Sequence, residues 1–318
     1  MISESYSIIK WHYSQAEHAS VKRWTLMLPA AGCEYHQRTG GCVMCGFYQA
    51  NKKYSFGRLY PPLVFKILYK LAYLETRRRR PEELFLYNGG SFFNHREIPK
   101  NFSDYLFQAV GKHPSLKRIM IESRVEYITP ERLNRAKQLL AGKTLMVGIG
   151  LESKDDHVRN HLIGKGLALK HFEKTVAVLK ESKVGVLAYV FLKPLGLSEE
   201  EAAADAWETI KYCHSLGIDE VELSCAFIQE GTKMAAAYER GEFSPPTLWT
   251  IVEIIRKTAS KGLTISIGNF GDEPPPIAIP RNDCPDNCSP EIYRLIDDYR
   301  TTGRFDFLRL PNCACRPS

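Results

Sequence analysis

The sequence predicts an α/β protein, namely a partial or open (β/α) barrel that carries a small cysteine-rich appendage at its C-terminal end. Short β-rich runs alternate with helical patterns from about residue 23 to residue 270, as in βαβ units that build a parallel sheet. Seven such runs suit a barrel better than a doubly wound sheet. The proline-rich stretch GDEPPPIAIPRNDCPDNC then ends the alternation. We therefore expect an N-terminal segment at residues 1–22, a barrel at 23–270 and a metal-binding appendage at 271–318.

Each element of this barrel has local support in the sequence. The expected strands span residues 23–29, 83–89, 117–123, 144–152, 184–194, 220–227 and 264–270. Helical patterns lie between them at residues 62–76, 101–112, 130–140, 170–182, 198–215 and 246–261, and one short helix is expected at 290–300. Two helices have clear starts, because Thr129 precedes Pro130 and Ser198 precedes three glutamates.

The composition is that of an ordinary globular chain. Of 318 residues, 44% are hydrophobic and 25% are charged. No apolar run approaches the roughly 20 residues that cross a bilayer, and the N-terminal stretch MISESYSIIKWHYSQ lacks the pattern of a secretion signal. We therefore expect a cytoplasmic protein without a membrane partner. The net charge of +7 fits a nucleic-acid binder and a solvated basic surface equally well.

Three cysteines gather just after the first expected strand. Cys33, Cys42 and Cys45 form a C-x8-C-x2-C pattern in GCEYHQRTGGCVMCGF. Loops at the carboxyl ends of strands carry the active sites of α/β barrels, so this loop is a candidate catalytic centre. Three thiolates can hold a [4Fe–4S] cluster with one iron left open, whereas a structural zinc site normally fills all four positions. Zinc with His36 as the fourth ligand is the alternative.

Four more cysteines form two close pairs near the C-terminus: Cys284, Cys288, Cys313 and Cys315. Two pairs of this kind suit a tetrahedral zinc site, which would stabilise an appendage too small to bury a core of its own. An auxiliary iron–sulfur cluster and a site without metal are the alternatives. The two remaining thiols, Cys213 and Cys225, are expected in the core.

The segment GCVMCGF resembles the cluster loop of radical S-adenosylmethionine (radical SAM) enzymes, and the wider spacing is similar to that of the elongator catalytic subunit branch. Six further segments resemble, in the same order, the radical SAM proteins of archaeosine biosynthesis: LYNGGSFFN, IESRVEYI, GIGLES, LIGKG, LKPLGLSEEEA and QEGTKMAAAYERGEFSPPTLW. The resemblance covers nearly the whole chain. It departs from the family at Gly164, where an asparagine is expected, and at Thr247, where relatives have a tryptophan.

The resemblance implies a set of cofactor-binding residues at the ends of successive strands: Gly89, Gly90, Ser91, Glu122, Arg124, Glu152, Lys165 and Lys193. The first three would approach the methionine part of S-adenosylmethionine through backbone groups. Glu122 would accept hydrogen bonds from the cofactor's amino group, while Arg124 would meet a carboxylate or hold that glutamate. Glu152 would contact the ribose and Lys165 the cofactor carboxylate. Lys193 would contact cofactor or substrate, although solvated surface lysines are the alternative for both lysines.

The resemblance also implies a reaction and partners. An external electron donor would reduce the cluster, and the resulting cleavage of S-adenosylmethionine would give a 5′-deoxyadenosyl radical. The expected reaction breaks the carbon–nitrogen bond of a lysine joined to 7-deazaguanine in tRNA and leaves archaeosine. A separate lysine-transferring subunit of archaeosine synthase would be the partner. Two rivals remain, namely a radical enzyme that acts on a free nucleoside, small molecule or peptide, and a non-enzymatic iron–sulfur or zinc module that binds RNA.

Two basic segments bear on the RNA hypothesis. Lys52, Lys53 and Arg58 follow the cysteine loop on the expected catalytic face and are candidates for phosphate contacts. The run of arginines at residues 77–80 joins a helix end to a strand start, which places it at the opposite end of the barrel. That run is therefore not expected to touch the reacting group.

Overall fold

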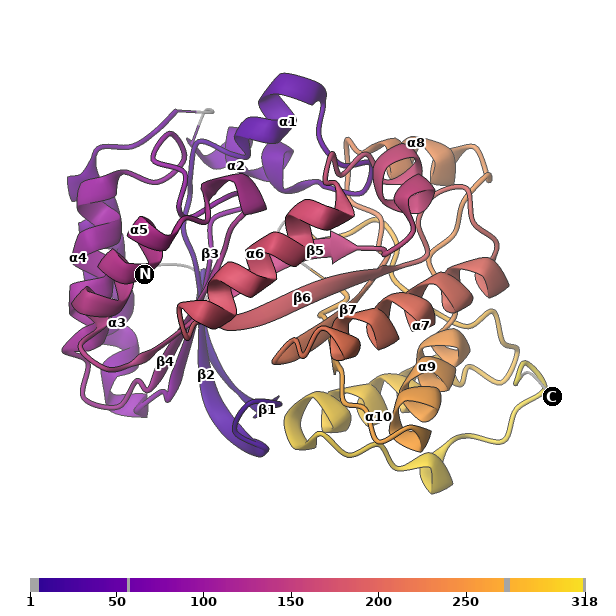
Figure 1. Cartoon of the computed structure of the whole chain (residues 1–318). Helices are drawn as coiled ribbons and strands as arrows, with labels where there is room; N and C mark the ends of the chain where they lie inside the picture. The colour runs from indigo at the N-terminus through magenta and orange to yellow at the C-terminus, as the bar shows by residue number, and fades with distance from the viewer. Residues whose placement is uncertain (1–5, 56–57, 272–274, 317–318) are drawn as a thin grey trace.

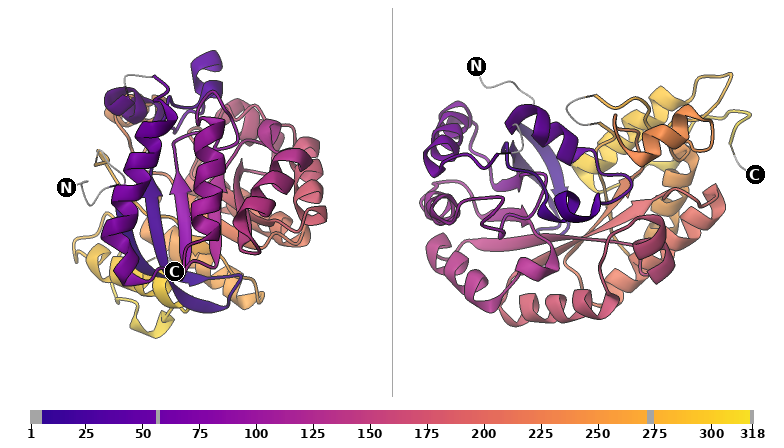
Figure 2. Two further views of the ribbon diagram at one scale, coloured as in Figure 1. Left: turned by 90° about the vertical axis from the view of Figure 1, so that its left-hand side faces the viewer. Right: turned by 90° about the horizontal axis from the view of Figure 1, so that it is seen from above.

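The computed structural model describes residues 6–55, 58–271 and 275–316, without the side chains of residues 53–55. Eight strands form one sheet in sequence order: β1 Ser7–Ser14, β2 Ala19–Met27, β3 Glu83–Tyr87, β4 Arg118–Glu122, β5 Thr144–Glu152, β6 Gly185–Leu192, β7 Glu220–Cys225 and β8 Ser266–Ile267. β1 pairs with β2 in antiparallel fashion, and every later pair is parallel. The sheet curves into an open barrel with its helices outside, as Figures 1 and 2 show.

The helices occupy the crossovers, as right-handed βαβ connections require. Their bounds are α1 Glu34–Thr39, α2 Phe47–Ser55, α3 Pro62–Thr76, α4 Lys100–Gly111, α5 Pro130–Leu140, α6 Leu169–Glu181, α7 Glu199–Ser215, α8 Lys233–Glu239, α9 Leu248–Ser260 and α10 Ser289–Thr302. A π-helical turn covers His157–Leu162, and short 3-10 turns cover Arg77–Arg79, Val125–Tyr127 and Phe307–Arg309. No described helix has the length and the apolar run that a bilayer span needs.

The prediction of an open α/β barrel is confirmed, with differences at its two edges. Strand β1 was not predicted from the sequence, and β2 begins at Ala19, within the segment expected at residues 1–22. The strand expected at residues 264–270 is reduced to Ser266–Ile267. The inner strands are buried on both faces, whereas edge strands are not, so the apolar pattern of the edge strands is weaker.

Helix α10 covers the opening between the two edges of the barrel (Figure 2). The Tyr299 hydroxyl donates to the carbonyl of Ile265 at 2.7 Å, and the Arg300 Nε donates to Ile267 at 3.0 Å. On the other side, the Ser20 hydroxyl of β2 donates to the Thr301 carbonyl at 2.6 Å. The segment expected as an appendage therefore packs into the barrel core, where Ile292 is fully buried.

The barrel interior is layered along the strand direction. Arg118 lies at the amino end and forms ion pairs with Glu83 and, at 2.8 Å, with Glu220, and all three side chains are almost completely buried. An apolar layer follows, made of Phe85, Met120, Met146 and Leu187. This packing fills the amino end of the barrel, so a ligand could enter only at the carboxyl end.

Candidate functional site

The three loop cysteines lie at the carboxyl end of the barrel, where the sequence placed them. Cys33 precedes α1 as its N-cap residue, and Cys42 and Cys45 form a turn in which the Cys45 N–H donates to the Cys42 carbonyl at 3.1 Å. The thiols are close enough to interact electrostatically, because Cys33 raises the pKa of Cys42, and both raise that of Cys45. The larger cause is burial, which raises the pKa of all three thiols and that of Cys45 to about 12.

The loop is fastened to segments that follow two other strands. The Val43 N–H donates to the Ile163 carbonyl at 2.9 Å, beyond β5. The Gly46 N–H donates to the side-chain oxygen of Gln229 at 2.9 Å, beyond β7. A side chain at residue 46 would overlap Gln229, since a Cβ there would lie 2.5 Å from the amide oxygen. Glycine at this position therefore allows the close approach that the cysteine turn requires.

The donor set fits an iron–sulfur cluster better than a zinc ion. Among the described residues, the group of three or more potential ligands close enough to hold one metal ion is at the C-terminus and does not include this loop. A single zinc ion would draw its sulfurs to about 2.3 Å from one centre, whereas a four-iron cluster binds each cysteine at a different iron. His36, the alternative fourth ligand, stacks on Tyr48 with the ring centroids 4.2 Å apart.

The backbone of Gly89, Gly90 and Ser91 approaches the cysteine loop closely. A Cβ on Gly90 would lie 3.4 Å from the Cα of Cys33 and 2.0 Å from a carboxylate oxygen of Glu97. Glu97 is buried and accepts hydrogen bonds from the N–H groups of Ser91 and Glu34. The structure thus places the three predicted residues beside the cysteines and adds a carboxylate that holds both segments.

Glu152 and Lys165 come together at the end of β5. Their side chains form an ion pair at 2.7 Å and are nearly buried. Burial alone would lower the pKa of the Lys165 ammonium, but the Glu152 carboxylate and the nearby Cys42 thiol raise it above the usual range. Glu152 has a φ of 67°, and such strained backbone is concentrated at functional sites. The two residues predicted to contact ribose and carboxylate therefore contact each other.

Gly164, where the resemblance expects an asparagine, adopts a φ of 74°. Glycine reaches this left-handed region without strain, and asparagine tolerates it better than most residues. The Gly164 carbonyl accepts a hydrogen bond from the Tyr35 hydroxyl at 2.8 Å. The departure from the family is therefore compatible with this backbone conformation.

Glu122 faces the interior of the barrel at the end of β4. Burial raises the pKa of this carboxyl to about 7, although the neighbouring Tyr189 hydroxyl opposes the rise. Glu222 of β7 lies near it, and burial likewise raises the pKa of Glu222 to about 7. Glycine at residue 148 allows the Tyr189 side chain to lie close to β5, since a Cβ there would come within 3.3 Å of the Tyr189 hydroxyl. The upper barrel thus holds two carboxyls that change charge near neutral pH.

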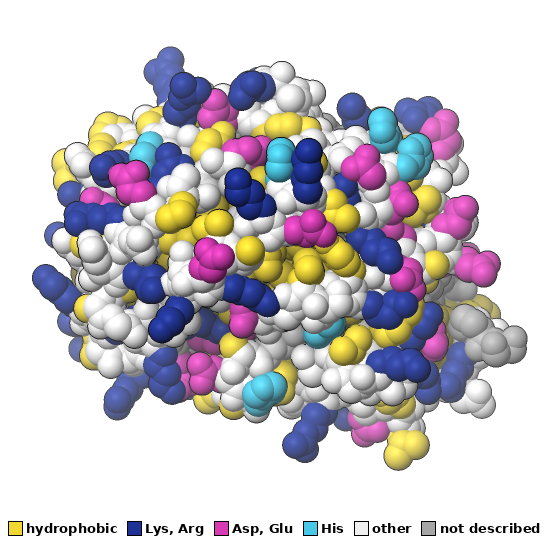
Figure 3. Space-filling view, in the orientation of Figure 1, with side chains coloured by type: hydrophobic (Ala, Val, Ile, Leu, Met, Phe, Trp, Pro, Cys, Tyr) yellow, Lys and Arg dark blue, Asp and Glu magenta, His cyan; other side chains and the backbone are white. Residues whose placement is uncertain are grey.

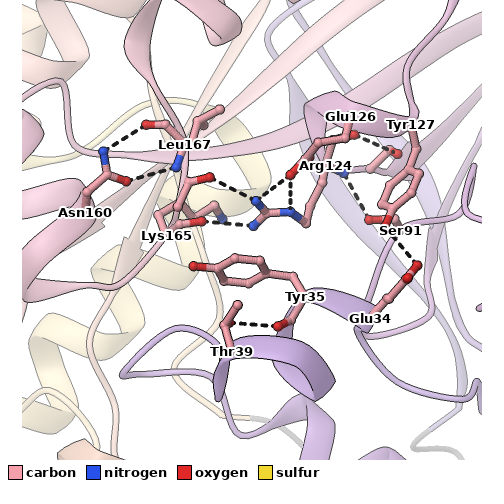
Figure 4. A network of polar contacts seen from close by, with 12 residues as sticks. Glu34, Tyr35, Thr39, Ser91, Arg124, Glu126, Tyr127, Asn160, Lys165 and Leu167 are labelled. Carbon is pink, nitrogen blue, oxygen red and sulfur yellow. Dashed lines mark hydrogen bonds and ion pairs between the residues drawn. The ribbon is translucent and has the colours of Figure 1, made fainter.

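Arg124 and Lys193 are occupied by contacts within the chain. Arg124 pairs with Glu126 at 2.7 Å, rather than with Glu122, and donates to the Lys165 carbonyl at 3.0 Å (Figure 4). Its guanidinium lies 3.9 Å from the Tyr35 ring centre. Lys193 folds back so that its ammonium donates to the Leu197 carbonyl at 2.6 Å, and burial lowers its pKa. The predicted cofactor contacts of these two residues stay predictions.

The four C-terminal cysteines converge as predicted, with their sulfurs within 4.8 Å of one another. The Cys315 sulfur lies 3.5 Å from that of Cys288 and 3.3 Å from that of Cys313. The indole N–H of Trp249 donates to Cys315 and the Asn282 amide donates to Cys288, both at 3.2 Å. Donors of this kind stabilise thiolate ligands from outside the coordination shell. The compact tetrad therefore fits a single zinc ion.

Several residues of the site were missed by the sequence analysis. Glu97 had one signal, because Asn94 precedes it by three residues in a pattern typical of capping turns. No sequence signal marks Gln229, Tyr189 or Glu222, because a single polar residue in a loop or strand is uninformative until the positions of the other strands are known. Cys213 and Cys225 are buried thiols in the main core, as expected.

The chain has the open-barrel fold that is found in radical SAM enzymes, with the cysteine loop at the carboxyl end of the barrel. The truncated archaeal Elp3 of Methanocaldococcus infernus superposes with a TM-score of 0.55 at 18% identity, over 75% of this chain and 60% of that chain. No protein-family model matches the chain.

The chain is similar to two proteins named archaeosine synthase subunit beta. It is 27% identical to the protein of Methanosarcina acetivorans, over 93% of this chain and 83% of that relative. It is 29% identical to the protein of Thermococcus kodakarensis, over 72% of this chain and 70% of that relative. An uncharacterized protein of Methanocaldococcus jannaschii is 28% identical over 74% of this chain, and the matched region covers 64% of that relative. The resemblance to radical SAM, archaeosine-related proteins is thereby confirmed.

Proposed function

We propose that this protein is a radical SAM enzyme in which Cys33, Cys42 and Cys45 hold a [4Fe–4S] cluster. The observation that carries the proposal is the convergence of three partly buried thiols, and no fourth cysteine of the loop, at the carboxyl end of an open barrel. A three-cysteine cluster leaves one iron free for an external ligand. Two relatives are named as subunits of archaeosine synthase, which supports a radical SAM role in archaeosine-related biosynthesis.

When bound, a reduced cluster and S-adenosylmethionine supply a 5′-deoxyadenosyl radical. The residues of this chain bind and orient that cofactor. The backbone at Gly89, Gly90 and Ser91 lies against the cysteine loop, and the two glycines place no side chain in the way of a ligand's methionine part. Glu122, whose carboxyl is buried at the end of β4, would accept hydrogen bonds from the amino group of that cofactor. Opening of the Glu152–Lys165 pair would free one acceptor and one donor for the ribose and the carboxylate.

The proposed substrate is tRNA that carries a lysine-modified 7-deazaguanine, with cleavage of the lysine carbon–nitrogen bond to give archaeosine. The names of the relatives support this choice, and the designation "subunit beta" supports a partner subunit that transfers the lysine. The net charge of +7 is compatible with RNA. Lys52 and Arg58 are exposed beyond the cysteine loop and remain candidate phosphate contacts, whereas the Lys53 side chain lies outside the described residues.

We also propose that Cys284, Cys288, Cys313 and Cys315 bind one structural zinc ion. Zinc binds the thiolate form, and the Asn282 amide and the Trp249 indole, which donate to the sulfurs of Cys288 and Cys315, favour that form. Asn282 links this site to the start of α9, because its side-chain oxygen accepts from the Leu248 N–H at 2.9 Å. The metal would therefore fasten the C-terminal segment to the barrel.

The decisive test of the reaction compares two substrates with the reconstituted enzyme under anaerobic conditions. Lysine-modified tRNA and, separately, the free lysine-modified base are supplied with S-adenosylmethionine and a one-electron reductant. We expect archaeosine and 5′-deoxyadenosine to form with the tRNA, and little turnover of the free base. Equal turnover of the free base would favour a small-molecule enzyme. Release of 5′-deoxyadenosine without any archaeosine would keep the radical chemistry and reject this substrate.

A further inference from the structure

A groove of about 460 Å³ lies beside the cysteine loop, and Arg124 is the one residue of its lining that has a predicted role above. It is lined by parts of α1, the loop after β3, the end of β4 and the start of α5. Its charged lining includes four arginines, Arg38, Arg96, Arg124 and Arg132, which we call the arginine groove. Figure 3 shows acidic and basic side chains interspersed over one face of the molecule, so a local excess of one sign is informative.

Two of the four arginines are neutralised within the groove. Arg96 pairs with Glu34 at 2.6 Å, and Arg124 pairs with Glu126 at 2.7 Å. Among the described residues, neither Arg38 nor Arg132 forms an ion pair with a carboxylate. Four guanidinium groups against two carboxylates leave the groove with a net charge of +2.

The guanidinium of Arg132 is held in position by the chain. Its Nη1 donates to the Tyr127 carbonyl at 2.7 Å, which leaves its other N–H groups for a ligand. His95 also lines the groove, and its pKa is lowered by burial and by Arg132. His95 is therefore neutral at physiological pH and leaves the charge of the groove to its arginines.

The arginine groove shares a wall with the proposed active site. Glu34 and Tyr35 line the groove and directly follow Cys33 in the chain. Figure 4 shows Arg124 between Lys165 and the groove residues Glu126 and Tyr127, and Arg124 donates a hydrogen bond to the Lys165 carbonyl. A ligand in the groove would therefore lie next to the cluster loop.

The chemistry of the lining fits a nucleotide. Guanidinium groups bind phosphate oxygens in a planar, often bidentate geometry. Tyr127 adds an aromatic ring, which is the usual surface on which unstacked RNA bases lie. Glu126 orients the partly buried Arg124, and the Tyr127 carbonyl holds Arg132, so two of the four guanidinium groups have fixed positions. A simple carboxylate ligand would make no use of the aromatic ring.

We propose that the arginine groove binds the phosphate backbone and one base of the RNA strand that flanks the modified nucleotide. This inference rests on the proposed function, since the modified nucleotide must enter the barrel mouth. Arg38 and Arg132 neutralise phosphate, and Tyr127 supports the neighbouring base. The groove thereby gives the enzyme its preference for a polynucleotide over a free base.

The test measures the affinity of the reconstituted protein for lysine-modified tRNA at several salt concentrations. The variant carries Arg38→Gln and Arg132→Gln, and the matched control carries Arg77→Gln and Arg78→Gln, two exposed arginines at the opposite end of the barrel. We expect the groove variant to bind tRNA on the order of tenfold more weakly. The slope of log affinity against log salt should become shallower by ~0.7 for each phosphate that the variant no longer neutralises. The control should match the wild type.

The outcomes separate this inference from the proposed function. Equal iron content in the variant and the wild type shows that both are folded around the cluster. If the wild type converts modified tRNA and the groove variant binds it as tightly, the groove proposal is wrong and the proposed function stands. If the wild type does not bind tRNA, both are wrong. Unchanged tRNA affinity together with weaker binding of the partner subunit would assign the groove to a protein contact and overturn the proposal.

Discussion

Replacement of Glu222 by glutamine should change how stability depends on pH. Burial raises the pKa of this carboxyl from 4.5 to about 7 in the folded protein. At low pH the group is protonated in both the folded and the unfolded chain and has no effect. As pH rises towards 7, the unfolded chain ionises first, so the free energy of unfolding falls. The total loss above pH 7 is about 3 kcal/mol.

Glu222→Gln removes this loss because glutamine does not ionise. Urea unfolding of wild type and variant, prepared in the same reconstituted state, is measured at about pH 5 and about pH 8. The difference between their unfolding free energies should shift in favour of the variant by about 2 to 3 kcal/mol between these pH values. Because Glu222 lies near Glu122, the variant should also lower the pKa of Glu122 slightly.

Glu242→Gln is the matched control for this experiment. Glu242 is exposed, and a hydrogen bond from Arg240 lowers its pKa, so its contribution to stability appears as pH rises. That contribution is nearly complete at about pH 5, so this variant should differ from wild type by almost the same amount at both pH values. A Glu222 variant whose difference from wild type is constant with pH would refute the assignment of a protonated carboxyl inside the barrel.

Three further predictions follow from the packing. Arg118→Met should lower the free energy of unfolding by about 3 to 5 kcal/mol in urea titrations, because it leaves the buried Glu220 without an ion pair and Glu83 with Arg23 alone; a loss below about 1 kcal/mol would contradict this. Cys313→Ser should reduce bound zinc from about one per chain towards zero and lower Tm, with zinc measured by elemental analysis; full zinc content would reject the four-cysteine site. Gly90→Ala should weaken S-adenosylmethionine binding in equilibrium dialysis, because its methyl group would overlap Glu97 and displace the segment; unchanged affinity would remove this segment from the cofactor site.

The inner elements of the barrel were predictable from the sequence because one physical signal dominates each of them. Strand β5 has the expected bounds, Thr144–Glu152, since a long apolar run is bounded by polar turns. Helix α5 begins at Pro130, where the Thr129 side chain accepts from the Arg132 N–H at 3.4 Å. Local chemistry is sufficient for such elements.

Elements that depend on distant partners were not predictable. Strand β1 pairs with β2, and its edge is covered by α10, which begins only at Ser289. Glu97 accepts hydrogen bonds from the N–H groups of Ser91 and Glu34 because their segments meet at one end of the barrel. The cysteine positions of the site were predictable because clustered thiols are rare, whereas the pairing of Glu152 with Lys165 required the fold.

The central claim is that the loop with Cys33, Cys42 and Cys45 holds a cluster that cleaves S-adenosylmethionine. The most direct measurement is the formation of 5′-deoxyadenosine by the anaerobically reconstituted protein with a strong one-electron reductant. Wild type and a Cys213→Ala control, which removes a core thiol of α7, should both bind about four irons at the loop and form the product. Cys42→Ala should lose both. Formation of 5′-deoxyadenosine by Cys42→Ala at the wild-type rate would contradict the account.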